Sequence, residues 1–194
     1  MGLDIYFYKQ NKMNPEREEV LKNFKEADEA LSDFWMRHPD FNLAAHGGSI
    51  GKEHDELEKT YKVCKSVYNT LMGREEVAYF RKVNLLLPFF GYGDNCSDLI
   101  ITKDQVEDLI GTCSNVLDYF SNLHESNLFK EDYDKQEWIE YCQETLPNQD
   151  GFYFGDYEYG ERYTSKVEHV KKIFEEVIES VDWERQDLVM YCWW

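Results

Sequence analysis

Basic residues are scarce in this chain. Its 194 residues include 21 Lys and Arg against 39 Asp and Glu, which gives a formal net charge of −18 at pH 7. An excess of this size repels phosphate backbones, so we expect no direct binding of nucleic acid. The same charge is compatible with a basic protein partner, and also with plain solubility.

Long apolar runs and paired cysteines are also missing. No stretch approaches about 18 consecutive apolar residues, so we expect no membrane-spanning helix. The apolar start, residues 1–8, contains Asp4 and follows no basic region, unlike a secretion signal. The five cysteines include no C-x-x-C pair, and the odd count indicates free thiols in a reducing compartment. We therefore expect a cytoplasmic protein.

The motifs of common catalytic and cofactor sites are absent as well. Residues 46–52 resemble a P-loop, but the glycine spacing is one residue short and Glu53 replaces the required Ser or Thr. Gly91 and Gly93 begin a G-x-G pattern in which Cys96 takes the place of the third glycine. The five histidines are scattered, and no G-x-S-x-G elbow occurs. We therefore predict no metal, no cofactor and no catalytic residue, and lean away from an enzyme.

What is present indicates a folded chain. Hydrophobic residues make up 42% and aromatic residues 16%, which is too apolar for an acidic disordered segment. The length suits one sizeable core, so we expect a single domain over 1–194.

Apolar spacing predicts several helices. The first is capped by Asn14, has Pro15 in its first turn and ends at His38. Capping boxes begin two others, Thr102 with Gln105 and Ser165 with Glu168. The remaining helices are expected over 57–71, 75–87 and 131–145.

Strands are expected over 3–8, 99–101 and 188–194, where β-branched and aromatic residues gather. The aromatic segments 152–154 and 157–159 are predicted to be extended. Strands at both ends with helices between them predict an α+β domain, in which a small antiparallel sheet includes the N- and C-terminal strands and packs with about six helices.

The first candidate binding site lies in the predicted helix 75–87. At about 100° per residue, this helix would place Arg81 and Asn84 about 60° apart on one face, beside Tyr79 and Lys82. A guanidinium group suits phosphate or carboxylate, and a part-buried Asn requires hydrogen-bond partners. The alternative is that Arg81 pairs with an acid and Asn84 bridges parts of the fold.

A second candidate site lies in the aromatic segments that follow. Phe154, Tyr159 and Tyr163 offer ring faces that can stack on a planar base, and Arg162 adds a hydrogen-bond donor. The alternative is that these rings belong to the core. With the turn at 91–95, the complete candidate ligand-binding set is Tyr79, Arg81, Lys82, Asn84, Asp94, Asn95, Phe154, Tyr159, Arg162 and Tyr163.

Four elements of the chain, in order, resemble a family of small bacteriophage and prophage proteins. Members begin Met-Gly-Leu-Asp-Met-Tyr-Leu, similar to residues 1–7. Their Tyr-Trp-Arg-Lys-x-Asn-x-Ile-His-x-Trp-Phe helix is similar to 79–90, their Asp-Asn-Cys to 94–96, and their Gly-Phe-Phe-Phe-Gly…Tyr element to 151–159. The resemblance implies a viral accessory role in the host cytoplasm but supplies no reaction. Leu87 stands where the family has His, so any activity that depends on that His should be absent.

The residues and the resemblance together suggest two functions. The first is a protein that binds and sequesters a small anionic, nucleotide-like ligand, such as a host defence signal, without catalysis. The second is an acidic inhibitor that mimics the charge of nucleic acid against a basic host protein, with its acids on the predicted helix 131–145. Whether the chain forms a homo-oligomer is left open.

Overall fold

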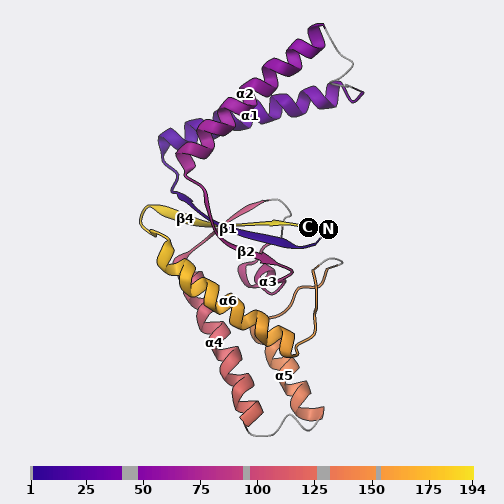
Figure 1. Ribbon diagram of the computed structural model, residues 1–194, viewed down its shortest axis with the longest axis vertical. Coiled ribbons are helices and arrows are strands. Elements are labelled where there is room, and N and C mark those ends of the chain that lie inside the picture. Colours follow the sequence, from indigo (N-terminus) through magenta and orange to yellow (C-terminus); the bar gives the residue numbers. More distant parts are fainter. Residues whose placement is uncertain (1, 41–47, 94–96, 126–131, 152–153) are drawn as a thin grey trace. The chain divides into compact units, whose positions relative to one another are not determined.

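The computed structural model describes residues 2–40, 48–93, 97–125, 132–151 and 154–194. Within these ranges the chain is an α+β protein with six helices and a four-stranded antiparallel sheet (Figure 1). It divides into two compact units, one of residues 1–10 and 75–194, the other of Asn11–Arg74. The expectation of one domain over 1–194 did not distinguish these two units.

The sheet belongs to the larger unit and has the strand order β2-β1-β4-β3. Its strands are β1 (Asp4–Asn11), β2 (Glu75–Arg81), β3 (Asp98–Ile101) and β4 (Gln186–Trp193). The prediction that the N- and C-terminal strands share one sheet is confirmed, since β1 and β4 are its two central strands. Alternation explains β1, in which Ile5 and Phe7 are buried on one face while Tyr6 lies on the other.

Helices α4 (Lys103–Glu125), α5 (Asp132–Thr145) and α6 (Glu161–Ser180) lie on one side of this sheet (Figure 1). The capping box before α4 is confirmed, because Gln105 N donates to Thr102 Oγ1 at 3.2 Å and Thr102 N donates to Gln105 Oε1 at 2.9 Å. The capping box predicted at Ser165 is wrong. Helix α6 already begins at Glu161, and the Ser165 hydroxyl donates back to the Glu161 carbonyl at 2.9 Å.

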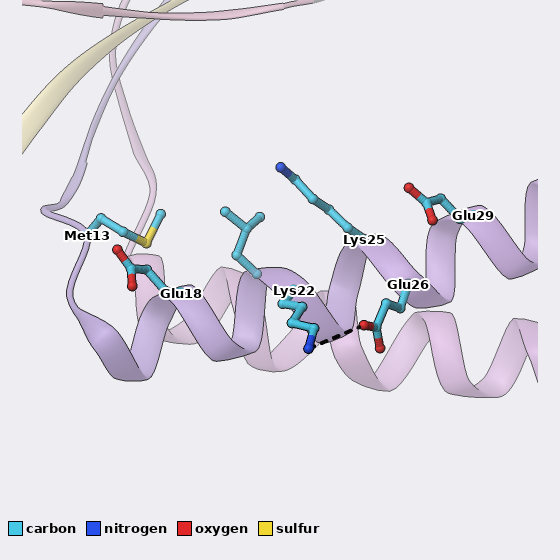
Figure 2. Close-up of a pocket in the computed structure, with 7 residues that line it drawn as sticks. Met13, Glu18, Lys22, Lys25, Glu26 and Glu29 are labelled. Atoms are coloured by element: carbon cyan, nitrogen blue, oxygen red, sulfur yellow. Dashed lines mark ion pairs between the residues drawn. The ribbon is translucent and has the colours of Figure 1, made fainter.

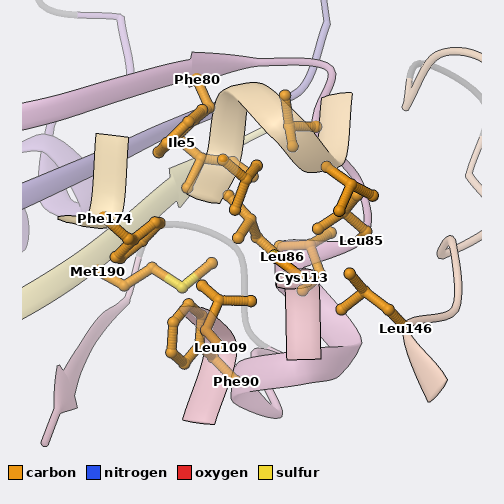
Figure 3. Packing of buried hydrophobic residues seen from close by; sticks show 14 of the residues in the cluster. Ile5, Phe80, Leu85, Leu86, Phe90, Leu109, Cys113, Leu146, Phe174 and Met190 are labelled. Atoms are coloured by element: carbon orange, nitrogen blue, oxygen red, sulfur yellow. The ribbon is translucent and has the colours of Figure 1, made fainter. Parts of the chain in front are cut away.

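The core lies between the sheet and these helices (Figure 3). Phe174 of α6 is at its centre, with its ring centroid 4.9 Å from Phe7, 5.8 Å from Phe80 and 6.0 Å from Phe90. The edge-to-face contact with Phe7 has the geometry that aromatic quadrupoles favour. Because Phe7 and Phe80 lie on β1 and β2, these rings fix α6 against that half of the sheet.

The smaller unit contains two long helices, α1 (Pro15–Arg37) and α2 (Ser49–Met72). The predicted cap of α1 is confirmed, because Arg17 N donates to Asn14 Oδ1 at 2.9 Å. The two helices meet through aromatic rings, with Phe24 stacked on Tyr68 at 5.2 Å. Helix α2 ends at Gly73, whose φ of 55° favours a residue without Cβ.

The predicted helix over 75–87 is wrong. Residues 75–81 form β2, whose partner is β1, and the chain then turns at Lys82 with φ 59°. Leu86–Phe90 form the short helix α3. Pro88 is tolerated in its first turn, because the backbone N–H that proline lacks would have no acceptor within the helix there. The alternation of buried Ala78 and Phe80 with exposed Tyr79 and Arg81 is a strand pattern, which the apolar spacing concealed.

None of the helices in the described ranges is both long and apolar enough to cross a membrane.

Candidate functional site

Tyr79 and Arg81 lie on the face of the sheet opposite the core. The Tyr79 hydroxyl donates to Asp4 Oδ1 at 2.5 Å, and Arg81 Nε lies 4.0 Å from the same carboxylate oxygen. The hydrogen bond to Asp4 raises the pKa of Tyr79 above its ordinary value. Asp4 therefore binds the Tyr79 hydroxyl and lies beside the Arg81 guanidinium. This agrees with the alternative interpretation, in which Arg81 pairs with an acid.

Asn84 and Lys82 do not share a face with Arg81, because no helix carries them. Asn84 is fully buried and donates from Nδ2 to the Gln149 carbonyl at 2.9 Å, while its Oδ1 has no hydrogen-bond partner. Lys82 lies against Gly155, where an added Cβ would come within 3.0 Å of Lys82 Cβ. These contacts place Gln149 and Gly155 against the turn after β2.

Two of the predicted stacking rings belong to the core. Phe154 and Tyr163 are buried, and Tyr163 donates its hydroxyl to the Leu146 carbonyl at 2.7 Å. Burial raises the pKa of Tyr163. Tyr159 is half-buried, and its hydroxyl accepts from Asn148 N at 3.0 Å. Asp94 and Asn95 lie outside the described residues.

Arg162, a member of the predicted set, borders a hollow. An open groove of about 480 Å³ is lined by Val83, Glu161, Arg162, Ser165, Lys166 and His169. Apart from Val83, these residues come from the first three turns of α6. Arg162, Lys166 and His169 follow the spacing i, i+4, i+7, which places them on one face of the helix.

Lys166 is the half-buried cation of this groove. Its Nζ donates to the Asp156 carbonyl at 3.0 Å, and the Asp156 carboxylate lies 3.7 Å from the largely exposed Arg162 guanidinium. Burial lowers the pKa of Lys166, the nearby Arg162 adds to that effect, and Asp156 opposes it. The Asp156 carboxylate offsets part of the repulsion between these two cations, and an added anion that bridges them would offset more of it.

The sequence analysis missed Lys166 and His169. Arg162 drew attention only as a donor beside aromatic rings, and the start of α6 was placed too late for its first turns to be read as a helix face. The spacing of Arg162, Lys166 and His169 could have indicated a shared helix face. This spacing is informative only if the helix is known to begin at Glu161.

Two other hollows lie on the helices of the smaller unit. One, of about 550 Å³, runs along α1 past Met13, Lys22, Lys25, Glu26 and Glu29 (Figure 2). Lys22 Nζ and Glu26 Oε1 are 3.8 Å apart in this hollow. The other, of about 460 Å³, lies on α2 and is also lined by both Lys and acidic residues. Acidic residues equal or outnumber lysines in both linings, whereas the groove on α6 has two cations and one acid, Glu161, so both are poorer anion sites than that groove.

Among the described residues, no three or more His, Cys, Asp or Glu side chains are grouped so that they could hold a metal ion. Comparisons with protein-family models, with curated proteins and with solved structures give no match to this chain. The phage-family resemblance therefore stays a prediction.

Proposed function

We propose that this chain binds a small phosphate-bearing molecule in the groove on α6, and that it sequesters the molecule without catalysis. The observation that carries the proposal is the grouping of Arg162, Lys166 and His169 on one face of a helix that borders a hollow. In a chain with 39 acidic residues, the lining of this groove has two cations and an imidazole against one acid, Glu161, with the Asp156 carboxylate beside Arg162.

The chemistry of the groove suits a phosphate group. The guanidinium of Arg162 offers a planar set of donors, and Lys166 adds an ammonium group; the Ser165 hydroxyl, which donates to the Glu161 carbonyl, also lines the groove. Each charge-assisted hydrogen bond contributes about 1.5–3 kcal/mol. Three such contacts would be sufficient for micromolar binding once the entropy of association is subtracted.

The ring-stacking half of the original hypothesis receives less support. None of the six described residues that line the groove is Phe, Tyr or Trp, and Phe154 and Tyr163 are occupied in the core. The phosphate, and not a base, is therefore the recognised part of the ligand in this proposal. A nucleotide-like defence signal in a phage-infected cell remains our proposal for its identity, based on the resemblance.

The test is calorimetric titration with inorganic phosphate and with AMP at low ionic strength. The double variant R162Q/K166Q should bind both ligands at least about tenfold more weakly, since each lost bond removes about 1.5 kcal/mol or more. The control K103Q/K172Q makes the same change in charge on α4 and elsewhere on α6, and should bind like the parent. Equal weakening in both variants would show that only the overall charge matters and would refute the site.

A second function, the acidic inhibitor, is favoured by one feature of α5. Glu137, Glu140 and Glu144 are exposed and lie within about 60° of each other around the helix. Such a stripe could engage a basic protein. Capture of a nucleic-acid-binding protein from host extract, lost in high salt and lost in the variant E137K/E140K/E144K, would support this function. Unchanged capture by the variant would remove it.

A further inference from the structure

Lys166 differs from Lys172 in burial, and from Lys171, which is also half-buried but pairs with Glu175, in bordering the groove. Lys172 on the same helix is exposed, whereas Lys166 is half-buried and its Nζ is held 3.0 Å from the Asp156 carbonyl, at the border of the groove. The amine thus has a fixed position beside a hollow that a small molecule can enter. Arg162 lies one turn before it, on the same side of the helix.

We propose that Lys166 captures the carbonyl carbon of a small phosphorylated aldehyde as a reversible imine, while Arg162 holds the phosphate. This inference rests on the proposed function and names its ligand class. Residues four apart on a helix have Cβ atoms about 5–6 Å apart. A molecule that carries an aldehyde and a phosphate a few bonds apart, as the open-chain form of a short sugar phosphate does, can reach both side chains.

The surroundings of Lys166 favour the neutral amine that such chemistry requires. Burial and the Arg162 guanidinium both disfavour its ammonium form, while Asp156 favours it. The other titratable groups that line the groove are Glu161 and His169, both on α6. An amine weakened as a base in this way is a nucleophile at lower pH than an ordinary surface lysine.

The reaction balances without a further reagent. Lys166 first gives one proton from its ammonium group to water. The amine nitrogen then bonds to the aldehyde carbon and forms a carbinolamine. In this step one proton of the nitrogen moves to the oxygen. The oxygen then takes up the proton released first, the C–O bond breaks, and the oxygen leaves as water while the nitrogen lone pair forms the C=N bond of a protonated imine. Because the groove is open to solvent, water can reverse the process, so the ligand is held and not consumed.

The test uses pyridoxal 5′-phosphate, which carries both an aldehyde and a phosphate, and pyridoxal, which lacks the phosphate. The protein is incubated with one equivalent of either compound, reduced with borohydride and mapped by mass spectrometry. We expect Lys166 to carry several-fold more label than Lys172 with the phosphate ester. Excess inorganic phosphate should suppress this label. With pyridoxal, Lys166 should carry no more label than Lys172. The same result is expected when the R162Q variant is treated with the phosphate ester.

The variant K166R removes the amine, so it should lose the label at position 166. The control K172R, outside the groove, should keep the label on Lys166 and bind phosphate like the parent. If phosphate binds to the groove but Lys166 is labelled no more than Lys172, the imine is refuted while the proposed function stands. If phosphate does not bind to the parent protein, the proposed function itself fails. If Lys166 is labelled equally by both compounds, the role of Arg162 is refuted.

Discussion

Replacing Asn84 with leucine should stabilise this protein and leave anion binding unchanged. The two side chains have nearly the same branched shape, and Asn84 is followed by the buried apolar run Leu85–Leu87. Asn84 makes one hydrogen bond from Nδ2, to the Gln149 carbonyl, while its Oδ1 is buried without a partner. An isosteric apolar residue removes both features together.

The magnitude follows from these two contributions. Loss of the bond to Gln149 should cost about 0.5–1.5 kcal/mol, and removal of an unpartnered buried acceptor should return about 1–3 kcal/mol. The Gln149 residue is only half-buried, so water can reach the carbonyl that loses its donor. The net expectation for Asn84→Leu is a gain of about 1 kcal/mol in the free energy of unfolding. The matched variant Asn84→Asp should lose several kcal/mol, because it buries a carboxylate or forces it to stay protonated.

Urea denaturation followed by circular dichroism measures both variants. A change in midpoint at constant slope reports stability alone. Phosphate titration of the same samples reports the ligand site. If Asn84→Leu lowers stability by more than about 2 kcal/mol, or abolishes phosphate binding, then the free oxygen serves a purpose that the described contacts do not show, and the assignment of Asn84 to a structural bridge is wrong.

Three further predictions concern backbone strain, thiol reactivity and pH. Gly155→Ala should lower the free energy of unfolding by about 2 kcal/mol, because φ is 102° and the new Cβ has no room, whereas Gly111→Ala on α4, which meets nothing within 4 Å, should raise it by about 0.5 kcal/mol. In a Cys96→Ser background, iodoacetamide should label Cys64 first. Burial raises the pKa of the other described thiols to about 12, which leaves about 10⁻⁴ of them ionised near pH 8: Cys113, Cys142 and Cys192. Faster labelling of these three thiols than of Cys64 would contradict their burial. Sulfate affinity should fall as the pH approaches 10.5 from below, because burial lowers the pKa of Lys166 below that ordinary lysine value and its ammonium group loses the proton first. The variant K166R should hold its affinity over the same range, and a parent that does so too would exclude Lys166 from the site.

Elements with complete local signals could be predicted from the sequence. The Asn14-Pro15 start of α1 and the Thr102–Gln105 box of α4 depend only on neighbouring residues, and both hydrogen-bond as expected. The start of α6 has no such signal, because its N-cap is Gly160, which has no side chain to bond the first turn. A serine five residues later supplied a false one.

Strand β2 could not be predicted because its deciding partner is far away in the chain. Its apolar residues fit helical spacing locally, but Phe80 pairs with Ile5 and Ala78 with Phe7, across more than seventy positions. The same error misplaced the candidate site, since Arg81 and Asn84 share a face only if 75–87 is a helix. Arg162 was identified for its chemistry, and its groove partners became visible only once α6 was located.

The strands that flank the smaller unit pair directly, with Lys9 opposite Glu75 and their side chains 3.2 Å apart. The chain therefore leaves the sheet and returns to it at adjacent points, as a tight hairpin turn would. A change in the length or sequence of the smaller unit, Asn11–Arg74, need not shift the register of any strand. That unit can thus vary during evolution while the sheet and the helix that carries the α6 groove stay unchanged.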